Sequence, residues 1–178
     1  LGKLAAIDRS QAVIQFFPDG SIETANSNFL SAMGYELSEI EGQHHQIFCD
    51  SDYSSSTEYK EFWDRIREGE FQSGQFRRIH KDGHSVWIQA SYNPVFDKSG
   101  KVIRVVKFAT DITEEKLRNA EYEGMIEAIN KTQAVIEFEL DGTIINANHN
   151  FLETMGYELN EIQGQHHSMF AETEFASS

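Results

Sequence analysis

The sequence predicts an α+β domain, a five-stranded antiparallel sheet with helices on one face, followed by the opening half of a second copy. Short apolar, β-branched runs are separated by turn sequences such as Asp19-Gly20 and Asp82-Gly83, as in hairpins. Between the second and third runs, apolar residues follow helical spacing. Residues 11–48 recur at 133–170 without a gap and with 25 of 38 positions identical, which indicates a duplicated domain start.

The elements of the complete copy are expected in the order β-β-α-α-α-β-β-β. A hairpin at 12–16 and 21–24 comes first. Two short helices follow, because apolar residues lie at helical spacing before Gly34 and Gly42. Tyr59, Phe62, Trp63 and Ile66 lie at i, i+3, i+4 and i+7 and predict a longer helix. Strands are expected at 74–81, 84–96 and 101–113.

The expected organisation is a helix at 1–10, a complete domain at 11–113, a connecting helix at 114–132 and a half domain at 133–178. The first residue is Leu1, inside a helical stretch, so we expect a fragment of a longer protein. The half domain would expose an unfinished sheet edge and a helix stripe of Phe151, Leu152 and Met155. This predicts self-association; the missing half is either cut away or replaced by exchange between chains.

Composition excludes several classes of function. With 15 Lys and Arg against 29 Asp and Glu, the net charge of -14 disfavours nucleic acid and anionic membrane surfaces as partners. The single cysteine, Cys49, excludes an internal disulfide or a multi-cysteine zinc cage, and it fits the cytoplasm. No apolar run approaches the length of a membrane span. Neither a nucleophile–base pair nor a set of metal ligands is recognisable, so we expect no enzymatic activity and no metal.

Several short motifs occur in a characteristic order. They are Asp19-Gly20, Ala25-Asn26-x-Asn28-Phe29, Met33-Gly34-Tyr35, Glu39-Ile40-x-Gly42, Lys81-Asp82-Gly83, Trp87-Ile88 and Asp111-Ile112-Thr113. With this order and spacing, the chain resembles the PAS sensory domain. It is most similar to cytoplasmic PAS modules of bacterial methyl-accepting chemotaxis transducers, of the aerotaxis and the tandem-PAS types. The points of similarity are Gly42-Gln43-x-His45, Trp63, Gly69-Glu70, Gly74, Trp87 and Pro94.

This resemblance implies a sensory input module that detects a small ligand or a redox or oxygen-related signal. The signal would leave the last strand through Asp111 and Thr113, enter the connecting helix and reach a chemotaxis output domain. The resemblance also implies a homodimer, with the chemotaxis kinase and its coupling protein as partners through that output domain. The alternatives are a ligand-free PAS dimerisation module, and the PAS input of a histidine kinase or a cyclic-dinucleotide enzyme.

The resemblance and the residue chemistry together name nine candidate cofactor-binding residues: Asn26, His44, His45, Asp52, Trp63, Arg77, Trp87, Gln89 and Asn93. Five of them have a simpler structural interpretation. Asn26 suits a helix N-cap, the two histidines suit a solvated pair, and both tryptophans suit a core. Strand polar residues, Arg78 among them, could also reach a ligand. Strand alternation places Gln89 and Asn93 on the face of Trp87 but leaves open which face lines a pocket.

The cofactor stays open between FAD, haem, another small ligand and none. His45 occupies the position that holds the adduct-forming cysteine in blue-light flavin PAS domains, so that photochemistry is not available there, and Cys49 reads as an ordinary thiol. Where the aerotaxis-type flavin site has an Arg-His pair, this chain has Cys49-Asp50. Only Asp52 matches a residue of that site, a further acidic one. Haem needs an axial ligand. The helix at 59–66 has no histidine, which leaves His44 or His45.

Overall fold

The computed structural model describes residues 10–170. The chain divides into two compact units, Leu1–Lys116 and Leu117–Ser178, each of which is described by itself. The helix expected at 1–10 lies almost wholly outside the described residues. Within the described part, no helix has both the length and the apolar character that a membrane span requires.

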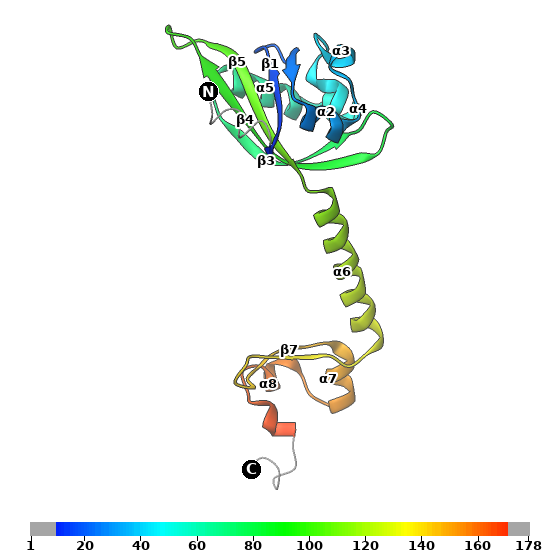
Figure 1. The fold of residues 1–178 in the computed structure, drawn as a ribbon. Coiled ribbons are helices and arrows are strands. Elements are labelled where there is room, and N and C mark those ends of the chain that lie inside the picture. The colour runs from blue at the N-terminus through cyan, green and yellow to red at the C-terminus, as the bar shows by residue number, and fades with distance from the viewer. Residues whose placement is uncertain (1–9, 171–178) are drawn as a thin grey trace. The chain divides into compact units, whose positions relative to one another are not determined.

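The first unit contains the expected five-stranded antiparallel sheet (Figure 1). Its strands are β1 (Ala12–Phe16), β2 (Ile22–Ala25), β3 (Gln72–Ile79), β4 (Ser85–Phe96) and β5 (Val102–Asp111). They lie in the order β2-β1-β5-β4-β3, with every neighbouring pair antiparallel. The predicted sheet is therefore confirmed, and β5 joins the two hairpins.

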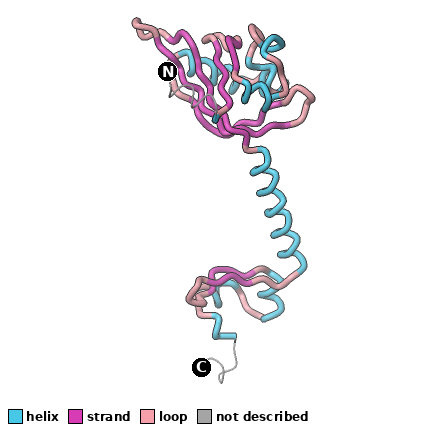
Figure 2. The backbone as a smooth tube through the Cα atoms, in the orientation of Figure 1, coloured by secondary structure: helices cyan, strands magenta, loops and turns pink. Residues whose placement is uncertain are grey.

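Helices cover one face of this sheet, as Figures 1 and 2 show. They are α2 (Ser27–Met33), α3 (Leu37–Ile40), the 3-10 helix η1 (His45–Phe48), α4 (Ser51–Ser54) and α5 (Thr57–Arg67). Sequence periodicity predicted only α2, α3 and α5. The other two helices are four residues each and begin at side-chain caps, where His44 accepts from Gln46 N and Asp50 accepts from Tyr53 N. Elements of that length are too short to show helical periodicity.

Asn26 joins α2 to the sheet. Its Oδ1 accepts from Phe29 N as the N-cap of the helix and also from Val13 N, each at 2.9 Å. Its Nδ2 donates to Gln11 O at 2.9 Å. At the other end of α2, Gly34 has φ +73, and a Cβ there would meet the His80 ring at 2.3 Å. The Asn26 side chain thus fixes the first turn of this helix, and Gly34 fixes its end.

The core lies between the sheet and the helices. Alternation along β4 turns Val86, Ile88, Ala90 and Tyr92 toward this core. Trp87, which alternates with them, lies on the opposite face of the sheet. The structure therefore settles which face of β4 looks toward the helices.

β5 runs directly into α6 (Thr113–Thr132), and the junction is also bonded to β4. Trp87 N donates to Thr113 Oγ1 at 2.9 Å, and Ile112 N donates to Trp87 O at 2.8 Å. Asp111 Oδ1 accepts from Thr113 N at 2.8 Å. The Lys116 ammonium lies 5.3 Å from the centre of the Trp87 ring. The first turn of α6 is therefore held by two strands.

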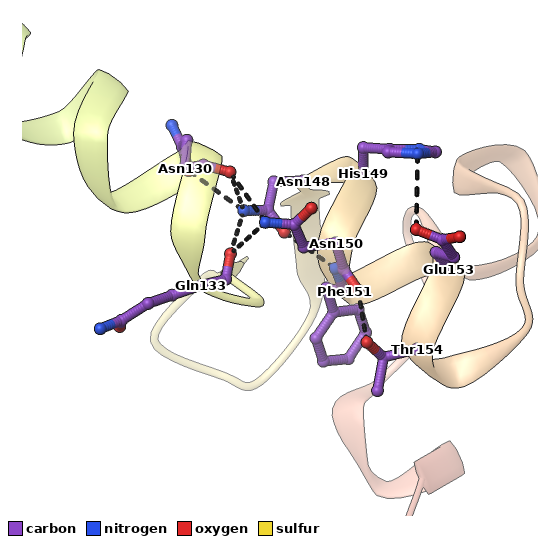
Figure 3. A network of polar contacts seen from close by, with 8 residues as sticks. All are labelled: Asn130, Gln133, Asn148, His149, Asn150, Phe151, Glu153 and Thr154. Atoms are coloured by element: carbon purple, nitrogen blue, oxygen red, sulfur yellow. Dashed lines mark hydrogen bonds and ion pairs between the residues drawn. The ribbon is translucent and has the colours of Figure 1, made fainter.

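The second unit repeats the first half of the fold. It contains β6 (Ile136–Phe138), β7 (Ile144–Ala147), α7 (His149–Met155), α8 (Leu159–Ile162) and η2 (His167–Phe170). Asn148 caps α7 as Asn26 caps α2, accepting from Phe151 N and Val135 N. The amides of Asn148 and Asn150 donate to backbone oxygens of Asn130 and Gln133 (Figure 3). Among residues 117–170, nothing corresponds to β3, β4 and β5.

Candidate functional site

A cluster of polar side chains lies inside the apolar core of the first unit. His45 and Lys107 have an exposed fraction of 0%, and Arg78 of 2%. They lie with the buried Tyr59 and Tyr92, and we call these five residues the polar cluster. Five elements contribute one residue each: η1, α5, β3, β4 and β5. Such buried polar groups are rare unless they are paired.

His45 bridges the two tyrosines. Its Nδ1 lies 2.9 Å from Tyr59 Oη, and its Nε2 lies 3.0 Å from Tyr92 Oη. Arg78 Nη2 donates to Tyr92 Oη at 3.1 Å. With that oxygen accepting from Arg78, we assign its proton to the bond with His45 Nε2, which leaves Nδ1–H to donate to Tyr59. The result is a directed chain from Arg78 through Tyr92 and His45 to Tyr59.

Burial keeps the imidazole and the two phenols of this chain uncharged. Burial, and then the charges of Arg78 and Lys107, hold the pKa of His45 well below its ordinary value. Burial raises the pKa of Tyr92 to about 12, and it also raises the pKa of Tyr59. At neutral pH the imidazole is therefore neutral and both phenols are protonated, as the directed chain requires.

Lys107 has no hydrogen-bond partner for its buried Nζ. The ammonium lies 4.9 Å from the centre of the Tyr92 ring and 5.6 Å from that of Phe29. These ring faces give only partial compensation for the lost hydration. Burial, and then the charge of Arg78, lower the pKa of Lys107 well below its ordinary value.

Arg78 is the second buried cation. Its Nη1 donates to Arg77 O at 2.8 Å, and its guanidinium carbon lies 4.9 Å from the centre of the Phe76 ring. Its Nε has no partner. The side-chain ion pairs of residues 10–170 include neither Arg78 nor Lys107. Among residues 10–170, Arg78 and Lys107 thus share one buried site without an ion-paired carboxylate.

Two family models match the two units. A model described as "PAS fold" matches residues 22–109, and one described as "PAS domain" matches residues 132–178. The chain belongs to the PAS family. The match of the second model agrees with the sequence repeat. It also agrees with the lack of counterparts of β3, β4 and β5 among residues 117–170.

The PAS chain is similar to three characterised proteins. It is 44% identical over 169 residues to the biofilm dispersion protein BdlA of Pseudomonas aeruginosa, covering 95% of this chain and 40% of that one. It is 28% identical over 109 residues to the aerotaxis receptor of Escherichia coli, covering 61% and 21%. A solved light-oxygen-voltage domain matches with a TM-score of 0.56 at 22% identity, covering 69% and 96%. This last likeness shows the fold alone. The chain spans less than half the length of both curated relatives.

The PAS core brings together two of the nine predicted site residues, His45 and Trp63, whose ring centres lie 5.4 Å apart. His44 lies beside them but has a structural contact: its Nε2 is 2.9 Å from Asp19 O, and its Nδ1 accepts from Gln46 N. A Cβ at Gly20 would meet this ring at 2.5 Å. Asn26 is bonded to β1, as described above.

The other five predicted residues lie away from the polar cluster. Trp87, Gln89 and Asn93 lie on the sheet face opposite the helices, together with Arg77. Arg77 donates to Asp50 at 3.1 Å. Asp52 is exposed in α4. Of these five, Trp87 contacts the start of α6.

Sequence reasoning missed three members of the polar cluster as site residues: Tyr59, Tyr92 and Lys107. Arg78 was considered only as one of several strand polar residues. A signal was present in the alternation along β5, where Lys107 stands between the inward-facing Val105 and Ala109. A charge at an apolar strand position is the pattern that would have identified the site.

The residues of this core do not fit flavin or haem. The rings of Phe16, His45, Trp63 and Tyr92 already contact one another, with centres 5.4 to 6.5 Å apart. Both nitrogens of His45 and both of His44 are hydrogen-bonded, so neither is a ready axial ligand. Cys49 Sγ lies 3.9 Å from His45 Nδ1, and burial raises the pKa of this thiol. Cys49 is therefore an unactivated thiol.

One group of side chains at the β3–β4 turn could hold a metal ion. His80, Asp82 and His84 place three potential ligand atoms within 4.8 Å of one another. Asp82 Oδ1 already accepts from His84 N at 3.1 Å and lies 2.9 Å from His80 Nδ1 and 2.5 Å from His84 Nδ1. These contacts explain the three side chains as a cap of the β3–β4 turn. The expectation that the chain binds no metal stays a prediction.

Proposed function

We propose that this chain is a sensory input module. A change in ligand occupancy at the polar cluster of the first PAS unit alters its packing and hydrogen bonds. The change passes through β4 and β5 to α6, and from there to a chemotaxis output domain in the longer receptor. The module acts in the cytoplasm and has no enzymatic activity of its own.

The observation that carries this proposal is that two of the three strands of the cluster also hold the start of α6. Tyr92 lies on β4 and Lys107 on β5, and Tyr92 pairs directly with Lys107 across the sheet. Farther along the same strands, Trp87 and Thr113 make the junction. No Gly- or Ser-rich segment separates β5 from the helix. A change at the cluster therefore has a short, covalently continuous route to α6.

The relatives support a role in behavioural signalling. One is named for biofilm dispersion and the other for aerotaxis. Because the chain spans only part of each, the chemotaxis kinase and its coupling protein are proposed as partners of the longer receptor. Their contacts would lie in the output domain.

A homodimer is part of the proposal, supported by the surface of α6. Tyr122, Met125, Ile126 and Ile129 are exposed and lie at i, i+3, i+4 and i+7, so they share one face of the helix. A stripe of this kind is typical of a helix that pairs with a second helix. The same stripe also favours the alternative, a PAS module that only dimerises.

A glycine inserted directly after Thr113, in a receptor that carries this module ahead of a chemotaxis output domain, tests the route. Adding a residue rotates α6 beyond Thr113 by about 100° relative to the strands and displaces Lys116 from the Trp87 ring. We expect the receptor to lose its response to stimulus while its expression and kinase coupling persist. A glycine inserted beside Gly100, in an exposed turn, is the matched control and should keep the response. A normal response with the Thr113 insertion would contradict transmission through this junction.

A further inference from the structure

The polar cluster has hydrogen-bond donors in excess. The three buried side-chain atoms without a partner in residues 10–170 are Trp63 Nε1, Arg78 Nε and Lys107 Nζ, and each is a donor. The Trp63 N–H lies near enough to Tyr59 to affect the pKa of its hydroxyl, without making a hydrogen bond of good geometry. At the end of the directed chain, the Tyr59 O–H is a further donor. The group missing from this site is therefore an acceptor.

The cluster also lacks negative charge. Arg78 bonds to the hydroxyl of Tyr92, and Lys107 lies over the ring of the same residue, so the two cations are neighbours. The chain has 29 acidic residues, but the nearby Asp50 pairs with the exposed Arg77. A buried charge without a counter-ion is strongly unfavourable, and a guanidinium is a preferred partner for carboxylates and phosphates.

A pocket gives access to one of these cations. It has a volume of about 360 Å³ and is lined by residues that include Arg77 and Arg78 as well as the carboxylates of Asp50 and Glu58. It lies at β3, which is one of the two edge strands of the sheet. This volume is at the small end of ligand sites, so it suits a small molecule.

We propose that the polar cluster binds a small oxyanion, the carboxylate or phosphate group of a small molecule, which pairs with the Arg78 guanidinium and the Lys107 ammonium. This inference rests on the proposed function, because it names the ligand class of the same site. The oxyanion accepts from the unpartnered donors and supplies the missing negative charge. Because Tyr92 contacts both Arg78 and Lys107, binding of the oxyanion changes the environment of β4 and β5 together.

The test uses the purified chain with acetate, succinate or inorganic phosphate, each compared with chloride at matched ionic strength. Thermal unfolding is followed by tryptophan fluorescence, which reports on the first unit because Trp63 and Trp87 are the only tryptophans. We expect at least one oxyanion to raise the unfolding midpoint. A response to acetate or succinate alone identifies a carboxylate, and a response to phosphate alone identifies a phosphate group.

Three variants assign any binding to the cluster. Lys107→Met and Arg78→Met should each weaken the oxyanion affinity by at least about tenfold, because each removes a charged hydrogen bond. Lys98→Met removes an exposed cation that does not line the pocket and should leave the affinity unchanged. Native mass spectrometry of the purified chain reveals an anion that is already bound, and this anion should be lost from the Lys107→Met variant.

Two results would overturn the inference. One is a midpoint that no oxyanion shifts, in a chain that carries no bound anion. The other is oxyanion binding of equal strength in the wild type and Lys107→Met. A chain that binds no anion but loses signalling on insertion after Thr113 would overturn the ligand class alone and leave the input function standing.

Discussion

Replacing Lys107 by methionine should raise the free energy of unfolding of the ligand-free first unit by about 1–3 kcal/mol. The substitution removes a buried ammonium that has no hydrogen-bond partner and retains an unbranched side chain of similar length. Denaturant unfolding followed by tryptophan fluorescence measures the change. Lys98→Met, in an exposed turn, is the matched control and should stay within about 0.5 kcal/mol of the wild type. Destabilisation by Lys107→Met would show that the ammonium is well satisfied.

The same variant should have a flatter pH dependence of stability. The folded-state pKa of Lys107 is lowered below its ordinary value of 10.5. At a pH between these two values, the Lys107 amine is protonated in the unfolded chain and largely unprotonated in the folded chain. The free energy of unfolding of the wild type therefore rises with pH in that window. His45, whose pKa is also lowered, contributes only below its ordinary value of 6.5. Cys49 and the tyrosines, whose pKa values are raised, act above about 9. Between the ranges in which His45 and Cys49 titrate, the difference in pH dependence between the wild type and Lys107→Met therefore isolates Lys107 among the groups facing it.

Replacing Tyr92 by phenylalanine should lower the free energy of unfolding by about 2–4 kcal/mol. The hydroxyl bonds to both Arg78 and His45, so its removal leaves two buried polar groups without that partner. Tyr59→Phe is the matched comparison, because its hydroxyl bonds to His45 alone. It should cost about 1–2 kcal/mol. Equal losses in the two variants would contradict a chain that runs through Tyr92.

Local structure could be predicted from the sequence because local chemistry determines it. The repeated segment shows this directly. Asn26 and Asn148 make the same caps, and Gly34 and Gly156 end their helices with φ of +73 and +74. The second unit keeps these features without counterparts of β3–β5 among the described residues. Turns, caps and short helices therefore follow from neighbouring residues alone.

The polar cluster could not be predicted in this way, because its burial depends on residues far apart in the sequence. His45 and His167 follow the same local motif, yet His45 is fully buried and His167 is exposed. Phe16 is 0% exposed, whereas its counterpart Phe138 is 43% exposed. The difference is that, among residues 10–170, α5, β3, β4 and β5 are present only around the first copy. Tyr59 and Tyr92, the partners of His45, come from these elements.

Alternation within the strands predicted which residues share a face but not which face is covered. Gln89 and Asn93 were correctly grouped with Trp87, and all three proved to lie opposite the helices. The choice of face is made by the packing of α2 and α5, which no pattern within β4 records. Lys107 was overlooked for the same reason. Its burial can be recognised only once it is known which face of β5 the helices cover.

The most direct test of the uncompensated charge in the PAS core is an NMR titration of the Lys107 side chain in the intact chain. The Cε resonance is assigned by comparison with Lys107→Met and followed with pH, without and with a saturating oxyanion that binds. The account predicts a pKa well below 10.5 in the free chain, and a higher pKa when the oxyanion pairs with the ammonium. An ordinary pKa in the free chain, unchanged by the oxyanion, would contradict it.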